Sequence, residues 1–469
     1  MPTSDVAWGV VPQDWFQPNR PIVIARAPGR LDVMGGIADY SGATVLELPL
    51  ALGALVAAQE CDDGLLSVRS GGPGAPAHVR LEAALPCAVV WEGPPDEAPQ
   101  RVRAALEEAD ALWASYILGT VGILAVAPSL PRLRGLRLSV WSDVPAGAGV
   151  SSSAALEVAT LRALQVLLGL DVKPPALALL AQQTEHRVAL APCGIMDQMT
   201  ALLGRAGHLL MLRCQPAQVL GQRRLPRSVH VVGIDSGVAH RVAGDQYGRV
   251  RAAAFMGRAI IAAHNPADPP SGYLCNLTPE RFLASYAPLL PESITGTAFL
   301  ERYGETGDTA TRVTPEATYR VRACTAHPIF EQANVEAFLA GLERYEHTGE
   351  IGVLEEEAGA AMYRSHESYS ARCGLGTPET DLIVDLVRER GPAHGLYGAK
   401  ITGGGAGGTV AVLGAGADAR VHTAAEQVAA EYARRSGNTA RVITGSGPGA
   451  LEWPARRVMM DRTGDIHEL

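Results

Sequence analysis

The sequence has no long apolar run. No stretch approaches the roughly 18 consecutive apolar residues that a membrane-spanning helix needs. Residues 1–13 also lack the basic stretch and apolar core of a secretory signal. The seven cysteines are widely spaced, odd in number and without a Cys-x-x-Cys pair, so neither a disulfide framework nor a zinc site is indicated. We therefore expect a cytoplasmic protein that does not bind membranes.

Positive charge is also scarce. With 40 basic and 49 acidic residues the chain has a formal net charge of −9, which argues against a nucleic-acid partner. Any anionic ligand must then be held by local groups, because the overall field repels it. The chain also lacks the Walker A pattern Gly-x-x-x-x-Gly-Lys-Ser/Thr, so the lysine that contacts nucleotide phosphates in that loop is missing.

The chain is long enough for two domains with buried cores, since it has 469 residues of which 47% are apolar. Strands are expected at 22–25, 31–34, 44–56 (with a turn near Pro49 and Gly53), 400–413 and 441–444. Helices are expected at 102–126, 152–168, 175–189, 331–347 and 417–435. Their irregular interleaving predicts an α+β protein with domains at 1–215 and 216–469 and a proline-rich insert at about 265–328.

A run of small residues, Pro145-Ala-Gly-Ala-Gly-Val-Ser-Ser-Ser-Ala-Ala155, leads directly into an apolar helix pattern. The first turn of a helix has unpaired N–H groups and the positive end of the helix dipole, and glycines let an anion approach the backbone. Serine hydroxyls add donors and can ligate Mg²⁺. The run therefore predicts a phosphate cradle, and the alternative is a serine that caps the helix after a flexible turn.

A second glycine run, Gly403-Gly-Gly-Ala-Gly-Gly408, contains the Gly-x-Gly-x-x-Gly spacing of dinucleotide-binding folds. In those folds the glycines open a helix, whereas here they lead into the strand-like Thr409-Val-Ala-Val-Leu413. We therefore reject dinucleotide binding. Two alternatives stay open: a loop that closes over phosphate or substrate, and a tight turn between strands.

Polar residues cluster early in the chain around Gly29, Gly35 and Gly36; they are Arg26, Arg30, Asp32, Asp39 and Tyr40. Each alone would be a solvated surface group, but short strands and turns can bring them to one rim. Farther along, Glu185 lies on an expected helix and Asp197 stands among apolar residues, where an unpaired carboxylate is costly. Asp197 is either a helix cap or, if the other motifs meet it, a functional group.

These segments resemble the motifs of the GHMP kinases in their sugar-kinase form. Ala27-Pro-Gly-Arg30 with Asp39-Tyr40 resembles the first motif, and residues 145–155 resemble the second, with Val150 where leucine is usual. Residues 403–408 resemble the third. The resemblance implies a ribosomal-S5-like N-terminal domain that binds the nucleotide, a ferredoxin-like C-terminal α/β domain, and an active site in the cleft between them.

Two further segments, Glu185-His186 and Cys193-Gly-Ile-Met-Asp-Gln198, resemble a galactokinase. The resemblance implies a kinase that uses ATP and Mg²⁺. Asp197 would orient or deprotonate the anomeric hydroxyl of a sugar, with Arg30 paired to it and facing the phosphate. Ser153 and Glu185 would ligate Mg²⁺. The sugar would contact Gly36, Ile37, Asp39, Tyr40, Gly194 and Tyr247. The nucleotide would contact Pro145, Gly147, Gly149, Ser151, Ser152, Ser153, Ala154, Gly404 and Gly405.

The first motif departs from the galactokinase pattern in one place. Galactokinases have Gly-Glu-His-Thr-Asp-Tyr, whose Glu-His pair contacts the C6 hydroxyl of galactose, whereas this chain has Gly35-Gly-Ile-Ala-Asp-Tyr40. L-Arabinopyranose has the ring hydroxyls of galactopyranose and lacks its C6 hydroxymethyl group. The difference favours L-arabinose, and residues 26–46, 273–277 and 323–328 resemble plant L-arabinokinases.

Rival interpretations remain at this stage. One is a kinase that phosphorylates C1 of galactose, an amino sugar or a uronic acid, and another is a sensor that binds ATP and sugar without turnover. The uninterrupted Ser151-Ser-Ser-Ala-Ala155, together with Arg30 and Asp197, favours an enzyme over a sensor. The sequence is compatible with a monomer or a homodimer.

Overall fold

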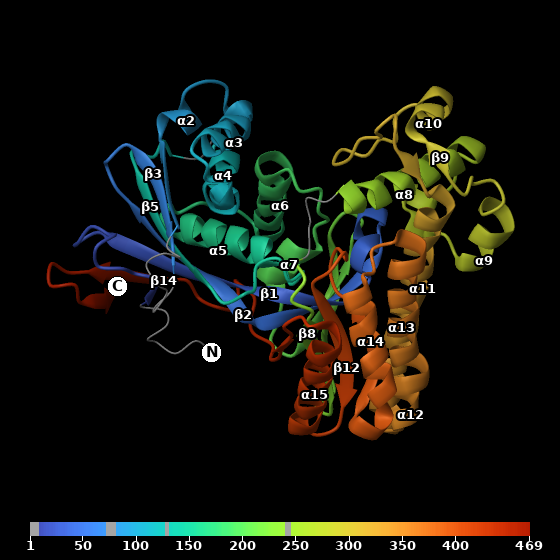
Figure 1. Cartoon of the computed structure of the whole chain (residues 1–469). Helices are drawn as coiled ribbons and strands as arrows, with labels where there is room; N and C mark the ends of the chain where they lie inside the picture. The colour runs from blue at the N-terminus through green and yellow to red at the C-terminus, as the bar shows by residue number, and fades with distance from the viewer. Residues whose placement is uncertain (1–8, 72–80, 127–130, 240–244) are drawn as a thin grey trace.

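The computed structural model describes residues 9–71, 81–126, 131–239 and 245–469. Two sheets with their covering helices account for most of the fold, and a third, mainly helical part packs beside them (Figure 1). Within the described ranges, no helix combines the length and the apolar character needed to cross a bilayer.

The larger sheet has nine strands in the order β15-β14-β1-β2-β5-β3-β4, and β2 also pairs with β6, which pairs with β7. Its long central strands are β1 (Pro21–Met34) and β2 (Thr44–Glu60). The others are β3 (Leu65–Ser70), β4 (Leu81–Pro86), β5 (Leu136–Ser142), β6 (His208–Arg213), β7 (Gln218–Arg224), β14 (Arg456–Met460) and β15 (Ile466–Glu468). Only β3 and β5 are parallel neighbours among these described pairs. Every residue of β1 after Pro21 is buried, because both faces of the sheet are covered.

Helices cover one face of this sheet through a shared apolar core. They are α2 (Ala88–Trp91), α3 (Ala98–Glu108), α4 (Ser115–Leu124), α5 (Ser152–Leu167), α6 (Pro174–Thr184) and α7 (Met196–Leu203). α5 lies against β1 and β2, so its N-terminus reaches the end of the sheet where β1 carries Arg30. That placement sets the position of the site.

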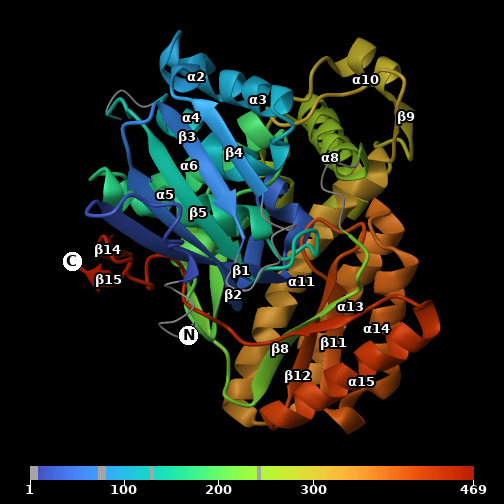
Figure 2. The ribbon, with the colours of Figure 1, turned by 60° about the vertical axis from the view of Figure 1, so that its left-hand side comes forward.

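The smaller sheet has the order β11-β12-β8-β13, all antiparallel (Figure 2). Its strands are β8 (Val229–Asp235), β11 (Leu396–Ile401), β12 (Thr409–Ala415) and β13 (Arg441–Ile443). α14 (Pro378–Arg390) and α15 (Asp418–Ser436) share a core with one face. The long α11 (Val321–Thr348), with α12 (Ile351–Val353) and α13 (Ala360–Glu367), lies behind the opposite face.

The third part has its own apolar core, which also includes Ile37 and Tyr369. It is formed by α8 (Asp245–His264), α9 (Pro279–Arg281), α10 (Gly296–Tyr303), the short ladder of β9 (Ile294–Thr295) with β10 (Thr318–Tyr319), and the start of α11. The proline-rich insert expected at 265–328 therefore consists of short helices and a two-stranded ladder, and its last residues belong to α11.

Several expected elements are confirmed. Helices expected at 152–168 and 417–435 are α5 and α15, and the strand expected at 441–444 is β13. The helix expected at 175–189 is α6, followed by a π-helical turn at Glu185–Ala189.

Other expectations about elements are wrong, each for a local reason. The helix expected at 102–126 is two helices, because Asp110 has a left-handed φ of 51° between them. The helix expected at 331–347 begins ten residues earlier and contains Pro328. The strand expected at 400–413 is β11 and β12 with the glycine run between them.

The two early strand predictions are also corrected. The pair expected at 22–25 and 31–34 is the single strand β1, and the turn expected within 44–56 is absent from the continuous β2. Instead of turns, the β1–β2 pairing shifts register between Pro28 and Arg30, where Arg30 faces Pro49. Proline has no N–H for the ladder and is tolerated at such an irregularity.

The division expected at residue 215 falls between the paired strands β6 and β7 of the larger sheet. The final strands β14 and β15 also return to this sheet, beside β1. The two sheets are thus connected by more than one passage of the chain.

Candidate active site

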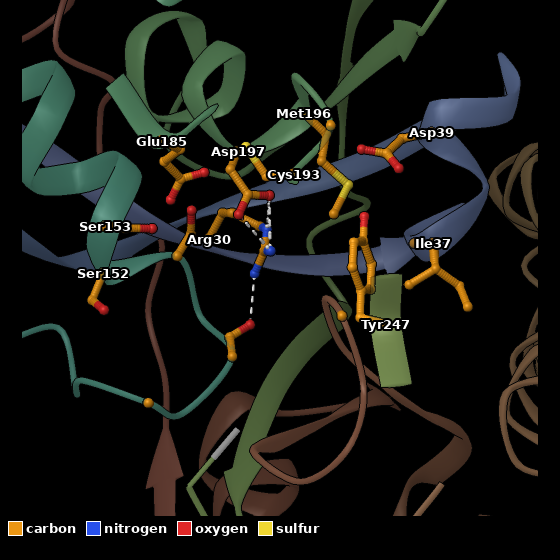
Figure 3. A pocket seen from close by; sticks show the side chains of 16 residues that line it. Arg30, Ile37, Asp39, Ser152, Ser153, Glu185, Cys193, Met196, Asp197 and Tyr247 are labelled. Carbon is orange, nitrogen blue, oxygen red and sulfur yellow. Dashed lines mark hydrogen bonds and ion pairs between the residues drawn. The ribbon is translucent and has the colours of Figure 1, made fainter. Parts of the chain in front are cut away.

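A pocket lies where β1, the start of α5, the start of α7 and the loop between β11 and β12 meet (Figure 3). Most predicted site residues line it: Arg30, Gly36, Ile37, Asp39, Gly147, Gly149, Ser151, Ser152, Ser153, Glu185, Gly194, Asp197, Tyr247 and Gly404. Cys193 and Met196 line it as well. Tyr40, Pro145, Ala154 and Gly405 do not line it, although the structure describes all four.

An ion pair occupies the centre of the pocket. Nε and Nη2 of Arg30 donate to the two carboxylate oxygens of Asp197, each at 2.9 Å, and Nη1 donates to the carbonyl of Gly149 at 2.8 Å (Figure 3). Arg30 is 3% exposed, so the two parallel hydrogen bonds fix its planar group. Asp197 lies in the first turn of α7 and makes no cap hydrogen bond there, so the helix-cap alternative does not hold.

Arg30 also lies next to a second carboxyl group, that of Glu47. Glu47 is fully buried and its Oε2 lies 3.2 Å from Nε of Arg30. Burial and the charge of Asp32 raise the pKa of Glu47 well above its ordinary value, although Arg30 opposes them. Burial would lower the pKa of Arg30, but Asp197 and Glu47 raise it, so the guanidinium stays charged.

The start of α5 forms one end of the pocket. Ser151 has a left-handed φ of 67° and its side chain makes no cap hydrogen bond, so the simple capping alternative is not what is seen. Its hydroxyl oxygen is buried and has no partner among the described residues. Unpaired N–H groups of the first helical turn and a buried donor without a partner suit an anion.

The second glycine run, residues 403–408, packs against this end. Residues 402–408 connect β11 to β12, and Gly404 faces the pocket, so the run is both an inter-strand loop and part of the site. Gly403 has a φ of 66°, and a Cβ there would stand 2.8 Å from the carbonyl oxygen of Gly149 and 3.1 Å from Nη2 of Arg30. The two glycine loops therefore touch, and glycine is required where they meet.

Two oxygen-bearing side chains beside α5 fit Mg²⁺. Glu185 is buried, and hydrogen bonds from Cys193, Ser153 and Gln198 oppose the burial that raises its pKa. Among the described residues, no group of three or more His, Cys, Asp or Glu side chains is placed to hold a metal. Mg²⁺ commonly takes one or two protein oxygens and completes its shell with phosphate and water, so Ser153 and Glu185 suffice.

The opposite end of the pocket carries Asp39. Its Oδ1 accepts a 2.7 Å hydrogen bond from the Tyr40 amide, while its Oδ2 is buried without a hydrogen-bond partner among the described residues. Burial raises the pKa of Asp39 to about 7, against the Tyr40 amide and the Arg251 charge. A buried carboxylate oxygen that lacks a donor suits a ligand hydroxyl. Gly194 lies against Asp39, since a Cβ added at Gly194 would stand 1.5 Å from Oδ2 of Asp39.

Tyr40 packs beside the Asp39 end of the pocket from outside it. Its ring packs edge-on against Tyr247, with ring centroids 6.1 Å apart at 84°. Tyr247 itself lines the pocket, in the region of Asp39 and Ile37 (Figure 3). Neither Gly36 nor Ile37 supplies a side-chain hydrogen-bonding group there.

The sequence analysis missed a buried clamp next to the site. Nε and Nη2 of Arg251, on α8, donate to Asp308 at 2.8 and 2.7 Å, and Nη1 donates to the carbonyl of Pro192 at 3.1 Å. The clamp fixes the segment that precedes α7. Arg251 stands four residues after Tyr247, which places both on one helix face, but nothing in the sequence marks Asp308 as its partner.

Comparisons with known proteins identify the family to which the chain is similar. The family profile "GHMP kinases N terminal domain" matches residues 115–205, and "Galactokinase galactose-binding signature" matches residues 13–60. L-Arabinokinase of Arabidopsis thaliana is 36% identical over 94% of this chain, which spans only 47% of that protein. Galactokinase of Chloroflexus aggregans is 33% identical, with 89% of this chain and 90% of that protein covered.

The fold is also that of solved structures. Lactococcus lactis galactokinase complexed with galactose matches with a TM-score of 0.69 at 21% identity, covering 92% of this chain and 94% of that one. The chain belongs to the GHMP kinases, and it has their two-domain α+β fold. Within that class it is a sugar kinase akin to galactokinases and L-arabinokinases, and like other GHMP kinases it depends on ATP.

Proposed function

We propose that this kinase transfers the γ-phosphoryl group of ATP to the anomeric C1 hydroxyl of L-arabinose. The observation that carries the proposal is the position of Arg30, whose guanidinium bonds to Asp197 and to the carbonyl of Gly149 at once. One buried cation therefore joins the group that would hold the acceptor hydroxyl to the loop that would hold the phosphates.

Different pocket residues bind the phosphates, stabilise the transferred group and orient the acceptor hydroxyl. The start of α5 and the glycine loop before it bind the phosphates through backbone N–H groups and serine hydroxyls. Arg30 faces the transferred group and stabilises the charge that spreads over its oxygens. Both oxygens of Asp197 are engaged by Arg30, so its main role is to orient the C1 hydroxyl for in-line attack. Ser153 and Glu185 would hold Mg²⁺, which would neutralise charge on the phosphates.

The choice of sugar rests on the other end of the pocket. Asp39 offers an unpartnered oxygen for ring hydroxyls, while Gly36 and Ile37 offer no polar side chain for a hydroxyl beyond the ring. A galactose bound there would bury its C6 hydroxyl without a partner, which costs roughly 1–3 kcal/mol. We expect a preference for L-arabinose over D-galactose of about 10–100-fold, since an apolar pocket rejects an extra hydroxyl only moderately.

The test is a sugar panel with L-arabinose, D-galactose, D-galactosamine and D-galacturonate in an ATP-coupled assay. We expect the highest kcat/KM with L-arabinose. A higher value for another sugar would refute the substrate assignment and leave a sugar-1-kinase. If calorimetry showed that ATP and sugar bind while no sugar gave ADP, the protein would be a sensor and not an enzyme.

A further inference from the structure

The space beside Gly36 is filled by a side chain from a distant part of the chain. A Cβ added at Gly36 would stand 1.6 Å from the hydroxyl oxygen of Tyr369, and 2.8 Å from both Cζ of Tyr369 and Oδ2 of Asp32. Real Cβ atoms essentially never approach other atoms so closely. The φ of Gly36 is not in the left-handed region, so space, and not backbone conformation, requires glycine here.

Tyr369 is held firmly in this position. It is fully buried, its hydroxyl accepts a hydrogen bond from the Ile37 amide at 2.9 Å, and the same hydroxyl donates to the carbonyl of Gly403 at 3.0 Å. The ring packs edge-on against His327 with centroids 5.3 Å apart, and Nζ of Lys400 lies 5.1 Å from its centroid. These contacts hold both the ring and the hydroxyl of Tyr369 beside position 36.

Asp32 forms the second wall of the same space. Its Oδ1 accepts from the Gly36 amide at 3.1 Å, and its Oδ2 accepts from Lys400 at 2.7 Å and from the Gly403 amide at 3.3 Å. Asp32 and Lys400 are both fully buried, so each charge needs the other. Tyr369 and Asp32 therefore both connect the loop at 36–37 to the second glycine run, at Gly403.

We infer that Tyr369 is a specificity-determining residue: its side chain occupies the place of a residue-36 side chain and so keeps the C6 end of the sugar pocket free of polar groups. The inference deepens the proposed function and rests on it. It also changes how specificity can be altered. The Glu-His pair typical of galactokinases cannot enter at 36 and 37 alone, because Glu at 36 would collide with Tyr369.

A double-mutant cycle measures this coupling. Gly36→Ala is made in the wild-type protein and in Tyr369→Leu, which lacks both the hydroxyl and the ring atoms near position 36. In the wild-type background we expect Gly36→Ala to lower kcat/KM for the preferred sugar at least 30-fold and to lower Tm. In the Tyr369→Leu background the same change should cost at least tenfold less in kcat/KM, and less in Tm, than in the wild type, with a residual cost because the added Cβ still stands 2.8 Å from Oδ2 of Asp32.

Two further variants separate packing from specificity. Tyr369→Phe removes the hydroxyl that would stand 1.6 Å from the added Cβ but leaves Cζ at 2.8 Å, so Gly36→Ala should have an intermediate cost in that background. Gly36→Glu/Ile37→His should raise the ratio of kcat/KM for D-galactose over L-arabinose at least tenfold in Tyr369→Leu, and should not raise it in the wild type. ATP binding by calorimetry checks that each variant is folded.

The outcomes distinguish the two claims. The role of Tyr369 would be overturned if Gly36→Ala lowered kcat/KM and Tm equally in the wild type and in Tyr369→Leu. It would also be overturned if Gly36→Glu/Ile37→His changed the ratio of kcat/KM for D-galactose over L-arabinose equally in both. The wild-type sugar panel alone decides the proposed substrate. If the panel selected another sugar, the cycle in Tm and in sugar ratio would still test Tyr369.

Discussion

The guanidinium of Arg30 and the carboxylate of Asp197 form two parallel hydrogen bonds of 2.9 Å between β1 and α7, although 167 positions separate them in the chain. The third branch of Arg30 bonds to Gly149 in the loop before α5. Three elements of the larger sheet and its helices are thereby fixed around one buried cation.

Asp197→Asn should lower kcat about 100–1,000-fold, because the amide retains the shape but loses the carboxylate that receives the acceptor hydroxyl and pairs with Arg30. KM for ATP should change less than threefold. Asp63→Asn is the matched control, since Asp63 accepts from Nε and Nη2 of Arg137 at 3.2 and 3.0 Å and does not line the pocket. Steady-state kinetics measure both. Near wild-type kcat for Asp197→Asn would be incompatible with the assigned role.

The pH dependence of kcat/KM should follow the ionisation of the Asp39 carboxyl group. Its pKa of about 7 belongs to the sugar-free protein, and the ionised form is the one that accepts sugar hydroxyls. kcat/KM should therefore fall about tenfold per pH unit below 7. Asp39→Asn should abolish this dependence and lower kcat/KM throughout. A profile that is flat from pH 5 to 8 in the wild type would refute the assignment.

The same carboxyl group should also make folding stability depend on pH, in the opposite direction: stability should fall as the pH rises, whereas kcat/KM should rise. Its folded-state pKa lies above the ordinary value of 3.8, so the native state binds the extra proton between the two values. The stability that Asp39 contributes is complete below about pH 4 and is lost as pH rises through 7. Urea unfolding from pH 5 to 8 should show a decline that is smaller in Asp39→Asn.

Asp308→Ala should destabilise the protein by about 3–5 kcal/mol, because it leaves the buried Arg251 without its carboxylate. It should also raise KM for the sugar, since Arg251 holds the segment at Pro192 that leads into the site. Glu389→Ala breaks the exposed pair with Arg435 and should cost far less, because solvent screens these two charges. Urea unfolding of both variants makes the comparison, and equal losses would contradict it.

Gly194→Ala should raise KM for the sugar at least tenfold and leave the Kd for ATP unchanged. The added Cβ would overlap Oδ2 of Asp39, whereas the nucleotide end of the pocket is not touched. Gly352→Ala is the control, since a Cβ there meets no atom within 4 Å. Calorimetric titration with ATP and kinetics with sugar separate the two ends, and an equal loss at both ends would show that the pocket as a whole had collapsed.

The residues at the centre of the site were predictable because each lies in a short local motif. A glycine run before an apolar helix predicts a helix N-terminus with unpaired N–H groups, and α5 begins directly after that run. Phosphate binding at this end of α5 stays a prediction. An aspartate among apolar residues needs a partner, and Arg30 was the arginine of another motif. The resemblance to the GHMP kinases implied that Arg30 pairs with Asp197, whereas local chemistry alone also allowed a surface role for Arg30 and a helix-cap role for Asp197.

Contacts between distant segments were not predictable in the same way. Tyr369 meets Ile37 across 332 positions, and it lies in a helical segment where a tyrosine suggests only packing. Asp308 lies in the insert, where neither periodicity nor spacing points to Arg251. Both contacts depend on how the third part of the fold packs on the sheets, and a single sequence does not specify that.

The strand errors have a different origin. Pro28-Gly29 and Pro49 are typical of turns, and in isolation they would end a strand. Here the two irregular points lie side by side in paired strands, so a register shift absorbs both and the strands continue. Tertiary pairing thus overrides the local preference in β1 and β2.

The most direct test of the account is the reaction itself. The wild-type protein is incubated with ATP, Mg²⁺ and either L-arabinose or D-galactose, kcat/KM is measured for each, and the product is identified by ³¹P NMR. The account predicts a phosphate on C1 and a kcat/KM for L-arabinose at least tenfold above that for D-galactose. A phosphate on another carbon, or equal or reversed preference, would contradict it.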